Sequence, residues 1–204
     1  GEPVKFRLIF RVISSNLFIV AGFLLFCTLI ARYYREEEAP LLIPALVSLA
    51  GGFLFHLFSG RRRNEVQITR KDAYVTVTAS WLIISLAGTL PYLLSHSIPS
   101  FVDALFESIS GFSTTGASIL TDIEALPKSV LLWRSLTHWI GGIGIIVLVI
   151  LVMPSLKMGG YQLFTLESSL QEKIQPKIKA VGIRLLMIYL ALTFLEMVLL
   201  LLGG

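Results

Sequence analysis

Long runs of apolar residues, separated by short polar segments, dominate the pattern of this chain. Five runs reach the roughly 20 residues that an α-helix needs to cross about 30 Å of hydrocarbon. They cover residues 12–31, 41–58, 73–94, 131–153 and 180–202. The first run is longer than the apolar region of a signal peptide and no small-residue cleavage site follows it. The pattern therefore predicts five membrane-spanning helices and an all-α integral membrane protein.

A shorter amphipathic stretch lies between the third and fourth runs. Its apolar positions, 101, 102, 105, 106 and 109, follow the spacing of one helix face. Pro99 and Ser100 provide a start signal, and Gly111 is expected to end the helix. Such a helix is about 15 Å long, half the thickness of a membrane. Residues 112–118, FSTTGAS, are small and rich in hydroxyls, so the sequence predicts a re-entrant loop in which extended backbone follows a half-helix.

Composition agrees with a membrane protein and excludes other classes. Of the 204 residues, 55% are hydrophobic and 15% are charged, whereas soluble domains have about 45–50% apolar and 25% charged residues. The mean hydropathy is +0.80. This content excludes a disordered or collagen-like chain, and a single cysteine, Cys27, excludes a disulfide-stapled one.

The distribution of Lys and Arg predicts the topology. The net charge is +4, and 12 of the 17 basic residues fall on one predicted side of the membrane: Lys5, Arg7, Arg11, Arg61, Arg62, Arg63, Arg70, Lys71, Lys157, Lys173, Lys177 and Lys179. Because positive loops stay in the cytoplasm, the N-terminus is predicted to be cytoplasmic. Arginines 61–63 could alternatively form a nucleic-acid patch, but topology and anionic lipid already explain a juxtamembrane basic run, so no nucleic-acid partner is expected.

The re-entrant segment is the predicted functional site. Backbone at membrane depth without helix is tolerated only where protein buries it or where it lines a wet cavity. Backbone carbonyls can replace the water shell of K⁺, and Gly116 permits the dihedral angles that orient them. The half-helix also directs the negative end of its dipole at the site, which favours a cation. The alternative is an ordinary polar loop that follows a short interfacial helix.

Two sequence stretches identify a family. FESISGFSTTGASILTDIEALPKSVLLWRSLTHWIGGIGIIVLVILVMPSL and, at residues 159–169, GGYQLFTLESS closely resemble the N-terminal half of TrkH/TrkG-type membrane subunits of potassium uptake systems, in the Trk/Ktr/HKT superfamily. The resemblance implies two extra N-terminal helices in residues 1–70 and a first repeat of span, pore helix, filter and span in residues 71–158. Residues 159–204 would then hold a cytoplasmic linker and the first helix of a second repeat. One quarter of a selectivity filter would lie in this chain.

The resemblance also implies the site residues. The main-chain carbonyls of the filter would be those of Thr114, Thr115, Gly116 and Ala117, with K⁺ as the transported ion and no organic cofactor. Unlike the TVGYG of tetrameric potassium channels, this filter has no Tyr-Gly after its central glycine.

Other residues are expected to support the filter or to lie at its mouth. The supporting residues would be Glu107, Gly111, Ser113, Ser118, Gly141 and Gly142. For Glu107, support is favoured over direct ion contact. Asp122 is expected at the outer mouth, where it would concentrate cations or only be a solvated connector residue.

The resemblance implies a location and partners as well. It implies a multi-pass protein of the bacterial inner membrane that contacts lipid, the remaining repeats of the same subunit, and a second copy in a homodimer. A cytoplasmic nucleotide-binding regulatory subunit, TrkA or its Ktr counterpart, is the expected partner. The apolar positions of residues 157–179 indicate an amphipathic element that Pro176 is expected to break. This element is a candidate contact for the regulatory subunit or only a connector that lies on the membrane surface.

No enzyme motif occurs in the chain. There is no nucleophile beside a base, no G-x-x-x-x-G-K and no H-E-x-x-H, and His56, His96 and His138 lack metal-ligand spacing. Two other functions stay open: a non-conducting membrane scaffold or assembly module, and a homotetrameric P-loop cation channel with one filter per chain. The second is disfavoured because no pore helix follows the fifth run.

Overall fold

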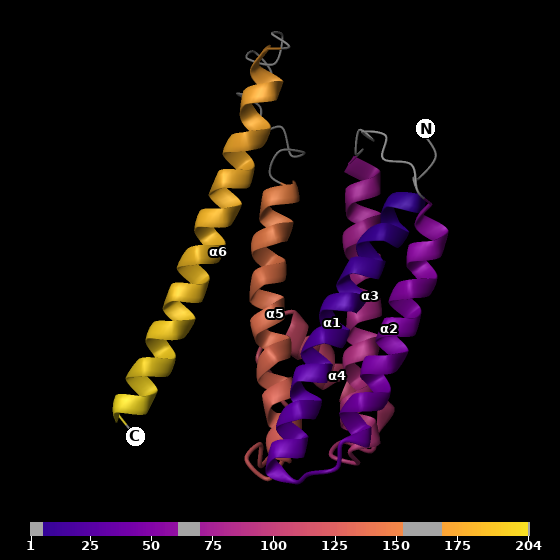
Figure 1. The fold of residues 1–204 in the computed structure, drawn as a ribbon, viewed down its shortest axis with the longest axis vertical. Coiled ribbons are helices and arrows are strands. Elements are labelled where there is room, and N and C mark those ends of the chain that lie inside the picture. Colours follow the sequence, from indigo (N-terminus) through magenta and orange to yellow (C-terminus); the bar gives the residue numbers. More distant parts are fainter. Residues whose placement is uncertain (1–5, 61–69, 153–168, 204) are drawn as a thin grey trace. The chain divides into compact units, whose positions relative to one another are not determined.

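The computed structural model of the protein describes residues 6–60, 70–152 and 169–203. All regular secondary structure in these ranges is helical, which confirms the predicted all-α fold class. The helices, in chain order, are α1 Phe6–Tyr34, α2 Ala39–Ser59, α3 Arg70–Leu94, α4 Phe101–Phe112, α5 Lys128–Val152 and α6 Ser169–Gly203 (Figure 1). The five predicted spans fall within α1, α2, α3, α5 and α6, and the short amphipathic stretch forms α4.

Four of these helices are long and apolar enough to cross a membrane, judged on the described residues. These spans are Ile9–Tyr34, Ala39–Ser59, Tyr74–Leu94 and Val181–Gly203. Helix α5 has 25 residues, the same length as α3, and covers the fourth predicted run up to Val152. Residue 153 and the side chains of residues 145–152 lie outside the described part of the chain.

The chain divides into two units, residues 1–142 and 143–204, and the re-entrant segment lies wholly in the first. One apolar core joins α1 to α5 within this first unit, with Leu24, Leu41, Tyr92, Phe112 and Trp133 buried in it. Van der Waals packing and interhelical hydrogen bonds hold such a bundle together, because lipid tails are as apolar as the side chains. The core therefore fixes α4 against the longer helices of this unit.

Helices α1 and α2 pack closely through small residues. The Ser14 hydroxyl donates to the Gly52 carbonyl at 2.8 Å, and a Cβ at Gly52 would lie 2.9 Å from the Phe18 ring. Small residues let membrane helices approach each other in this way. The two helices thus form an antiparallel pair that the short turn at residues 35–38 connects (Figure 1).

Glu36 ties this turn to the start of α5. Its carboxylate accepts hydrogen bonds from the amides of Lys128 and Ser129, at 2.7 and 2.9 Å, and from the Ser129 hydroxyl at 2.6 Å. Burial acts to raise the pKa of Glu36, but these donors and the nearby Lys128 charge together lower it. An acidic side chain here satisfies amides that a helix start leaves unpaired. Glu36 therefore caps a helix that begins about 90 residues later in the sequence.

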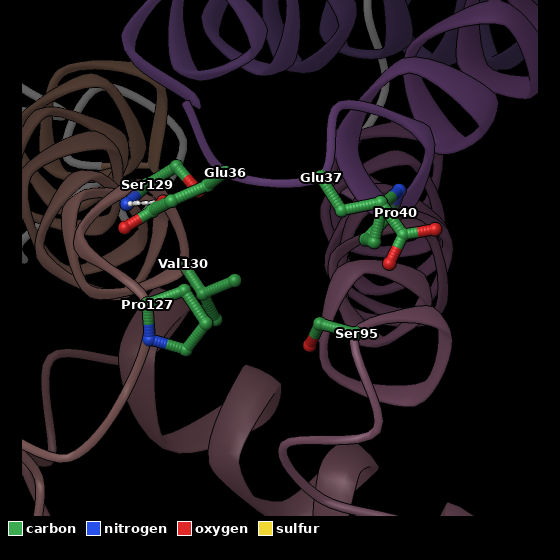
Figure 2. A pocket seen from close by; sticks show the side chains of 7 residues that line it. All are labelled: Glu36, Glu37, Pro40, Ser95, Pro127, Ser129 and Val130. Atoms are coloured by element: carbon green, nitrogen blue, oxygen red, sulfur yellow. Dashed lines mark hydrogen bonds between the residues drawn. The ribbon is translucent and has the colours of Figure 1, made fainter. Parts of the chain in front are cut away.

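A cavity of about 260 Å³ opens beside this cap. The α1–α2 turn, the end of α3 and the start of α5 line it, through Glu36, Glu37, Pro40, Ser95, Pro127, Ser129 and Val130 (Figure 2). Because the α1–α2 turn, the end of α3 and the start of α5 line the same cavity, these three segments lie together at one end of the first unit.

Two helix boundaries differ from the sequence-based expectation. Helix α4 does not end at Gly111 but continues to Phe112. Gly111 is needed for packing rather than for a turn, since a Cβ there would collide with the Thr137 side chain. Helix α6 continues through Pro176 without the predicted break, and the remaining part of the predicted amphipathic element, residues 157–168, lies outside the described residues.

Candidate functional site

The end of α4 turns the chain back on itself. The Thr114 amide donates to the Gly111 carbonyl at 2.9 Å and the Thr115 amide to the Ser110 carbonyl at 3.0 Å. This pair of bonds is a Schellman motif, which requires a left-handed residue just past the helix. Thr114 takes that place with φ 57°, although a β-branched residue is strained in this region. The sequence therefore positions a strained threonine where glycine is usual.

Gly116 supplies the second left-handed residue of the segment. Its φ is +76°, and a Cβ added there would meet nothing within 4 Å. Glycine is thus required by the backbone angle and not by a lack of space. Thr114, Thr115, Gly116 and Ala117 are all exposed in this chain. The turn therefore presents four consecutive residues at the end of a half-length helix.

The carbonyl oxygens of these residues fall into two groups. Among the hydrogen bonds of the described residues, none ends on the carbonyl oxygen of Thr114, Thr115 or Gly116. The Ala117 carbonyl, in contrast, accepts a hydrogen bond from the Ser110 hydroxyl at 2.5 Å. Three successive carbonyls are therefore free to coordinate a cation, while the fourth already has a donor.

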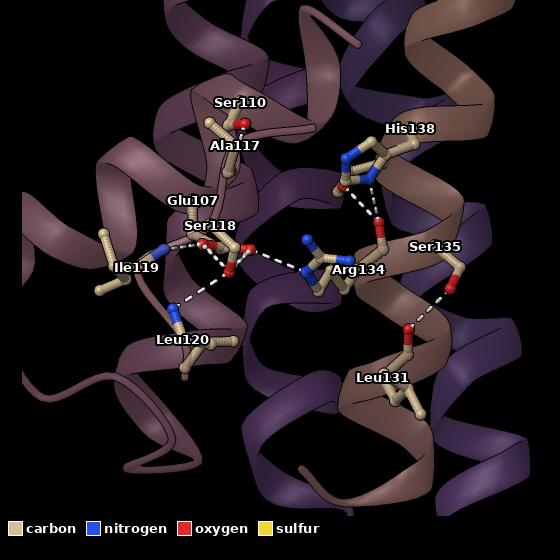
Figure 3. Close-up of polar contacts among 11 residues, drawn as sticks. Glu107, Ser110, Ala117, Ser118, Ile119, Leu120, Leu131, Arg134, Ser135 and His138 are labelled. Atoms are coloured by element: carbon tan, nitrogen blue, oxygen red, sulfur yellow. Dashed lines mark hydrogen bonds and ion pairs between the residues drawn. The ribbon is translucent and has the colours of Figure 1, made fainter. Parts of the chain in front are cut away.

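Glu107 holds the backbone that follows this turn (Figure 3). The Ser118 hydroxyl lies 3.0 Å from both carboxylate oxygens, and the Ile119 amide donates to Oε2 at 3.2 Å. The Leu120 amide donates in turn to the Ser118 hydroxyl at 3.1 Å. The structure thus brings together Glu107 and Ser118, two residues that the sequence analysis assigned to filter support.

Arg134 of α5 completes the surroundings of this carboxylate. Its Nε lies 2.7 Å from Glu107 Oε1, in the one ion pair found in the part of the chain that the structure describes. The Glu107 side chain is fully buried and that of Arg134 is 14% exposed. The sequence analysis did not assign Arg134 to the site. The signal available in the sequence was Glu107 itself, because an acidic residue in a membrane-embedded segment pairs with another polar group.

Two glycines let α5 approach the end of α4. A Cβ at Gly111 would collide with the Thr137 side chain, and one at Gly141 with the Phe112 carbonyl. The Phe112 ring packs edge-on against Trp133 at a centroid distance of 6.2 Å. Gly141 therefore lies against the end of α4, whereas Gly142 is only half-buried.

The remaining predicted residues have local partners. The Ser113 hydroxyl shares a hydrogen bond of 2.8 Å with the Thr115 hydroxyl. Asp122 is exposed, and its carboxylate accepts from the Ala125 amide at 3.3 Å. No group of three or more His, Cys, Asp or Glu side chains that could hold a metal ion occurs within residues 6–60, 70–152 and 169–203.

Several proteins of known classification are similar to this chain. Residues 44–203 match the TrkH family, described as a cation transport protein. An uncharacterized cation transporter of Methanocaldococcus jannaschii is 34% identical over 197 residues, 96% of this chain and 40% of that protein. The Trk system potassium uptake protein TrkH of Escherichia coli strain K12 is 31% identical over 195 residues, 93% of this chain and 40% of that protein. The potassium uptake protein TrkI of Halomonas elongata is 42% identical over 143 residues, 70% of this chain and 29% of that protein.

A solved structure shares the fold. The crystal structure of the potassium transporter TrkH from Vibrio parahaemolyticus superposes with a TM-score of 0.81 at 31% identity, covering 98% of this chain and 40% of that one. This chain thus spans about 40% of the length of TrkH proteins it matches. These similarities confirm the family resemblance in the sequence, and they agree with a multi-pass membrane protein that belongs to a family of transporters and not of enzymes. The chain belongs to the TrkH family of cation transport proteins.

Proposed function

We propose that this chain is part of a potassium-translocating subunit of a Trk-type uptake system, and that residues 114–117 supply one quarter of its selectivity filter. The observation that carries the proposal is the run of three free carbonyls, of Thr114, Thr115 and Gly116, at the end of a half-length helix. Carbonyl oxygens are the ligands that replace the hydration shell of K⁺. Ala117 contributes differently, because its carbonyl accepts the Ser110 hydroxyl.

The direction of α4 supports a cation site. The C-terminal end of a helix carries about half a negative charge, and α4 ends two residues before Thr114. Relatives named as potassium uptake proteins and as a cation transporter support the same ion class. Four filter segments around one pore would leave residues 114–117 of this chain exposed, as they are here. The remaining repeats of the same subunit are the expected neighbours of this surface.

The proposed location is the bacterial inner membrane with a cytoplasmic N-terminus. The acidic α1–α2 turn and the start of α5 lie at one end of the first unit (Figure 1). The start of α1 and the end of α2 lie at the other end, where Arg11 donates to the Gly60 carbonyl at 3.5 Å. Basic residues favour the cytoplasmic side, so the end of the unit that carries Arg11 is cytoplasmic and the end with the α1–α2 turn is outside. Helix α4 follows the end of α3 at this outer end, so α4 enters the membrane from outside. A homodimer and a nucleotide-binding regulatory subunit at the cytoplasmic face complete the proposed assembly.

A growth experiment tests the filter assignment. Cells that lack their own potassium uptake would express the complete protein containing this chain, as wild type or as Gly116→Asp. We expect wild type to support growth at limiting potassium and Gly116→Asp not to, at equal membrane expression. Equal growth of both would reject the filter and favour a non-conducting scaffold in which residues 113–118 are only a loop.

A further inference from the structure

A single buried carboxylate gathers donors from separate parts of the fold. Glu107 belongs to α4, Arg134 belongs to α5, and Ser118 and Ile119 belong to the backbone that leaves the turn. The carboxylate is the point where these segments meet (Figure 3). Removing one partner therefore changes the position of the others.

The carboxylate of Glu107 acts as the acceptor in this contact. A carboxylate offers two acceptor oxygens and no donor. Glu107 accepts from both the Ser118 hydroxyl and the Ile119 amide, and it does so without exposure to water. A buried charge is tolerated only when it is paired. The Arg134 guanidinium, at 2.7 Å, supplies the pairing charge.

The contact also fixes one end of the three free carbonyls. The Schellman turn holds the near end, because the amides of Thr114 and Thr115 are bonded to α4. Glu107 holds the far end, because Ser118 and Ile119 follow directly after Ala117. The backbone of residues 114–116 is thus fixed on one side by the Schellman turn and on the other by Glu107. The distances between its carbonyl oxygens therefore depend on the position of Glu107.

We propose that Arg134 is a positioning residue for ion discrimination, which acts through Glu107 to set the geometry of residues 114–117. This inference rests on the proposed filter and adds a residue from α5 to it. Arg134 does not touch the ion. Its guanidinium fixes the Glu107 carboxylate in the place where it accepts from both Ser118 and Ile119.

A charge-swap variant separates positioning from simple ion pairing. In Glu107→Arg/Arg134→Glu the attraction between the two helices is kept, but an arginine at position 107 has no acceptor for the Ser118 hydroxyl or the Ile119 amide. The readout is the K⁺ over Na⁺ preference of uptake by the complete protein in membrane vesicles. We expect the preference to fall about tenfold or more, which corresponds to about 1.4 kcal/mol. Arg134→Lys, which keeps the charge, should retain most of the preference.

Ser118→Ala keeps the test decisive if the swap variant does not reach the membrane. It removes one donor to Glu107 and no charge, so we expect normal expression with a lowered K⁺ over Na⁺ preference. Its matched control is Ser135→Ala, since Ser135 is exposed on α5 and its hydroxyl donates to the Leu131 carbonyl of the same helix at 3.1 Å. Lys128→Gln is the control for removing an exposed basic side chain from α5.

The outcomes distinguish this inference from the proposed function. If Gly116→Asp abolishes uptake while the swap variant keeps the wild-type preference, the positioning role of Arg134 is wrong and the filter stands. Ser118→Ala decides in the same way if the swap variant does not reach the membrane. If Gly116→Asp leaves uptake intact, both are wrong. A loss of preference in the swap variant, or in Ser118→Ala where the swap variant does not reach the membrane, supports the inference when both controls stay at wild-type values.

Discussion

At the scale of single residues, Thr114 shows that the site is not built for stability alone. A β-branched residue in the left-handed region costs about 1–2 kcal/mol relative to its ordinary conformation. Thr114 nevertheless holds the place in the Schellman motif that glycine usually fills, with φ 57° and its hydroxyl bonded to the Ser113 carbonyl at 2.7 Å. Strain of this kind persists where the surroundings fix it, and it is common at functional sites.

Replacing Thr114 by glycine should therefore stabilise the fold. We expect Thr114→Gly to raise the thermal midpoint of the purified protein, because glycine adopts a positive φ without strain. Thr115→Gly is the matched control, since Thr115 has no positive φ and glycine there should lower the midpoint. A lower midpoint for Thr114→Gly than for wild type would mean that Thr114 is not strained.

Gly141 carries a packing constraint of a different kind. A Cβ at this position would collide with the Phe112 carbonyl, which is rigid backbone. Gly141→Ala should force α5 away from the end of α4 and lower stability by about 1–3 kcal/mol, the usual range for overpacking. Thermal unfolding against Gly22→Ala checks this, because a Cβ at Gly22 meets nothing within 4 Å. Equal midpoints for the two alanine variants would contradict the close approach.

At the scale of elements, the sequence predicts the helices but not the contacts that join them. The apolar runs predict α1, α2, α3, α5 and α6 because a membrane span needs a fixed length of apolar sequence. The prediction that Gly111 ends α4 was wrong, because a glycine near a helix end can serve close packing as well as a turn. The joining roles of Glu36 and Arg134 were not predicted, since partners 93 and 27 residues apart leave no local signal.

The Glu36 cap makes the junction between the α1–α2 turn and α5 sensitive to acid. Its donors hold the pKa of Glu36 below the ordinary value of 4.5. Since the folded pKa is lowered, the stabilisation is complete above pH 4.5 and is lost as the pH falls through the lower folded pKa.

The pH dependence of unfolding tests this cap. We expect Glu36→Gln to lower the thermal midpoint at pH 7, and the difference from wild type to shrink as the pH falls below 4.5. Glu37→Gln, on the neighbouring exposed residue, is the control and should have a small effect at either pH. A difference for Glu36→Gln that does not change with pH would contradict an ionised cap.

At the scale of the whole molecule, the proposed topology places the start of α1 in the cytoplasm and the α1–α2 turn outside. The chain has one cysteine, Cys27, and it is fully buried, so this residue adds little background to the labelling of an introduced cysteine. We expect an impermeant maleimide to label Glu37→Cys in intact cells, and Arg7→Cys only after the membrane is permeabilised. The reverse pattern would place the start of α1 outside and overturn the assignment of α4 to the outer face.

The most direct test of the central claim compares two glycines in one ion-flux measurement. Gly116 and Gly22 both have open space for a Cβ, but only Gly116 has a positive φ. In vesicles that contain the complete protein, we expect Gly22→Ala to keep wild-type K⁺ over Na⁺ uptake and Gly116→Ala to lose K⁺ uptake or its preference over Na⁺. Unchanged K⁺ uptake and preference in Gly116→Ala would contradict a filter formed by the carbonyls of residues 114–116.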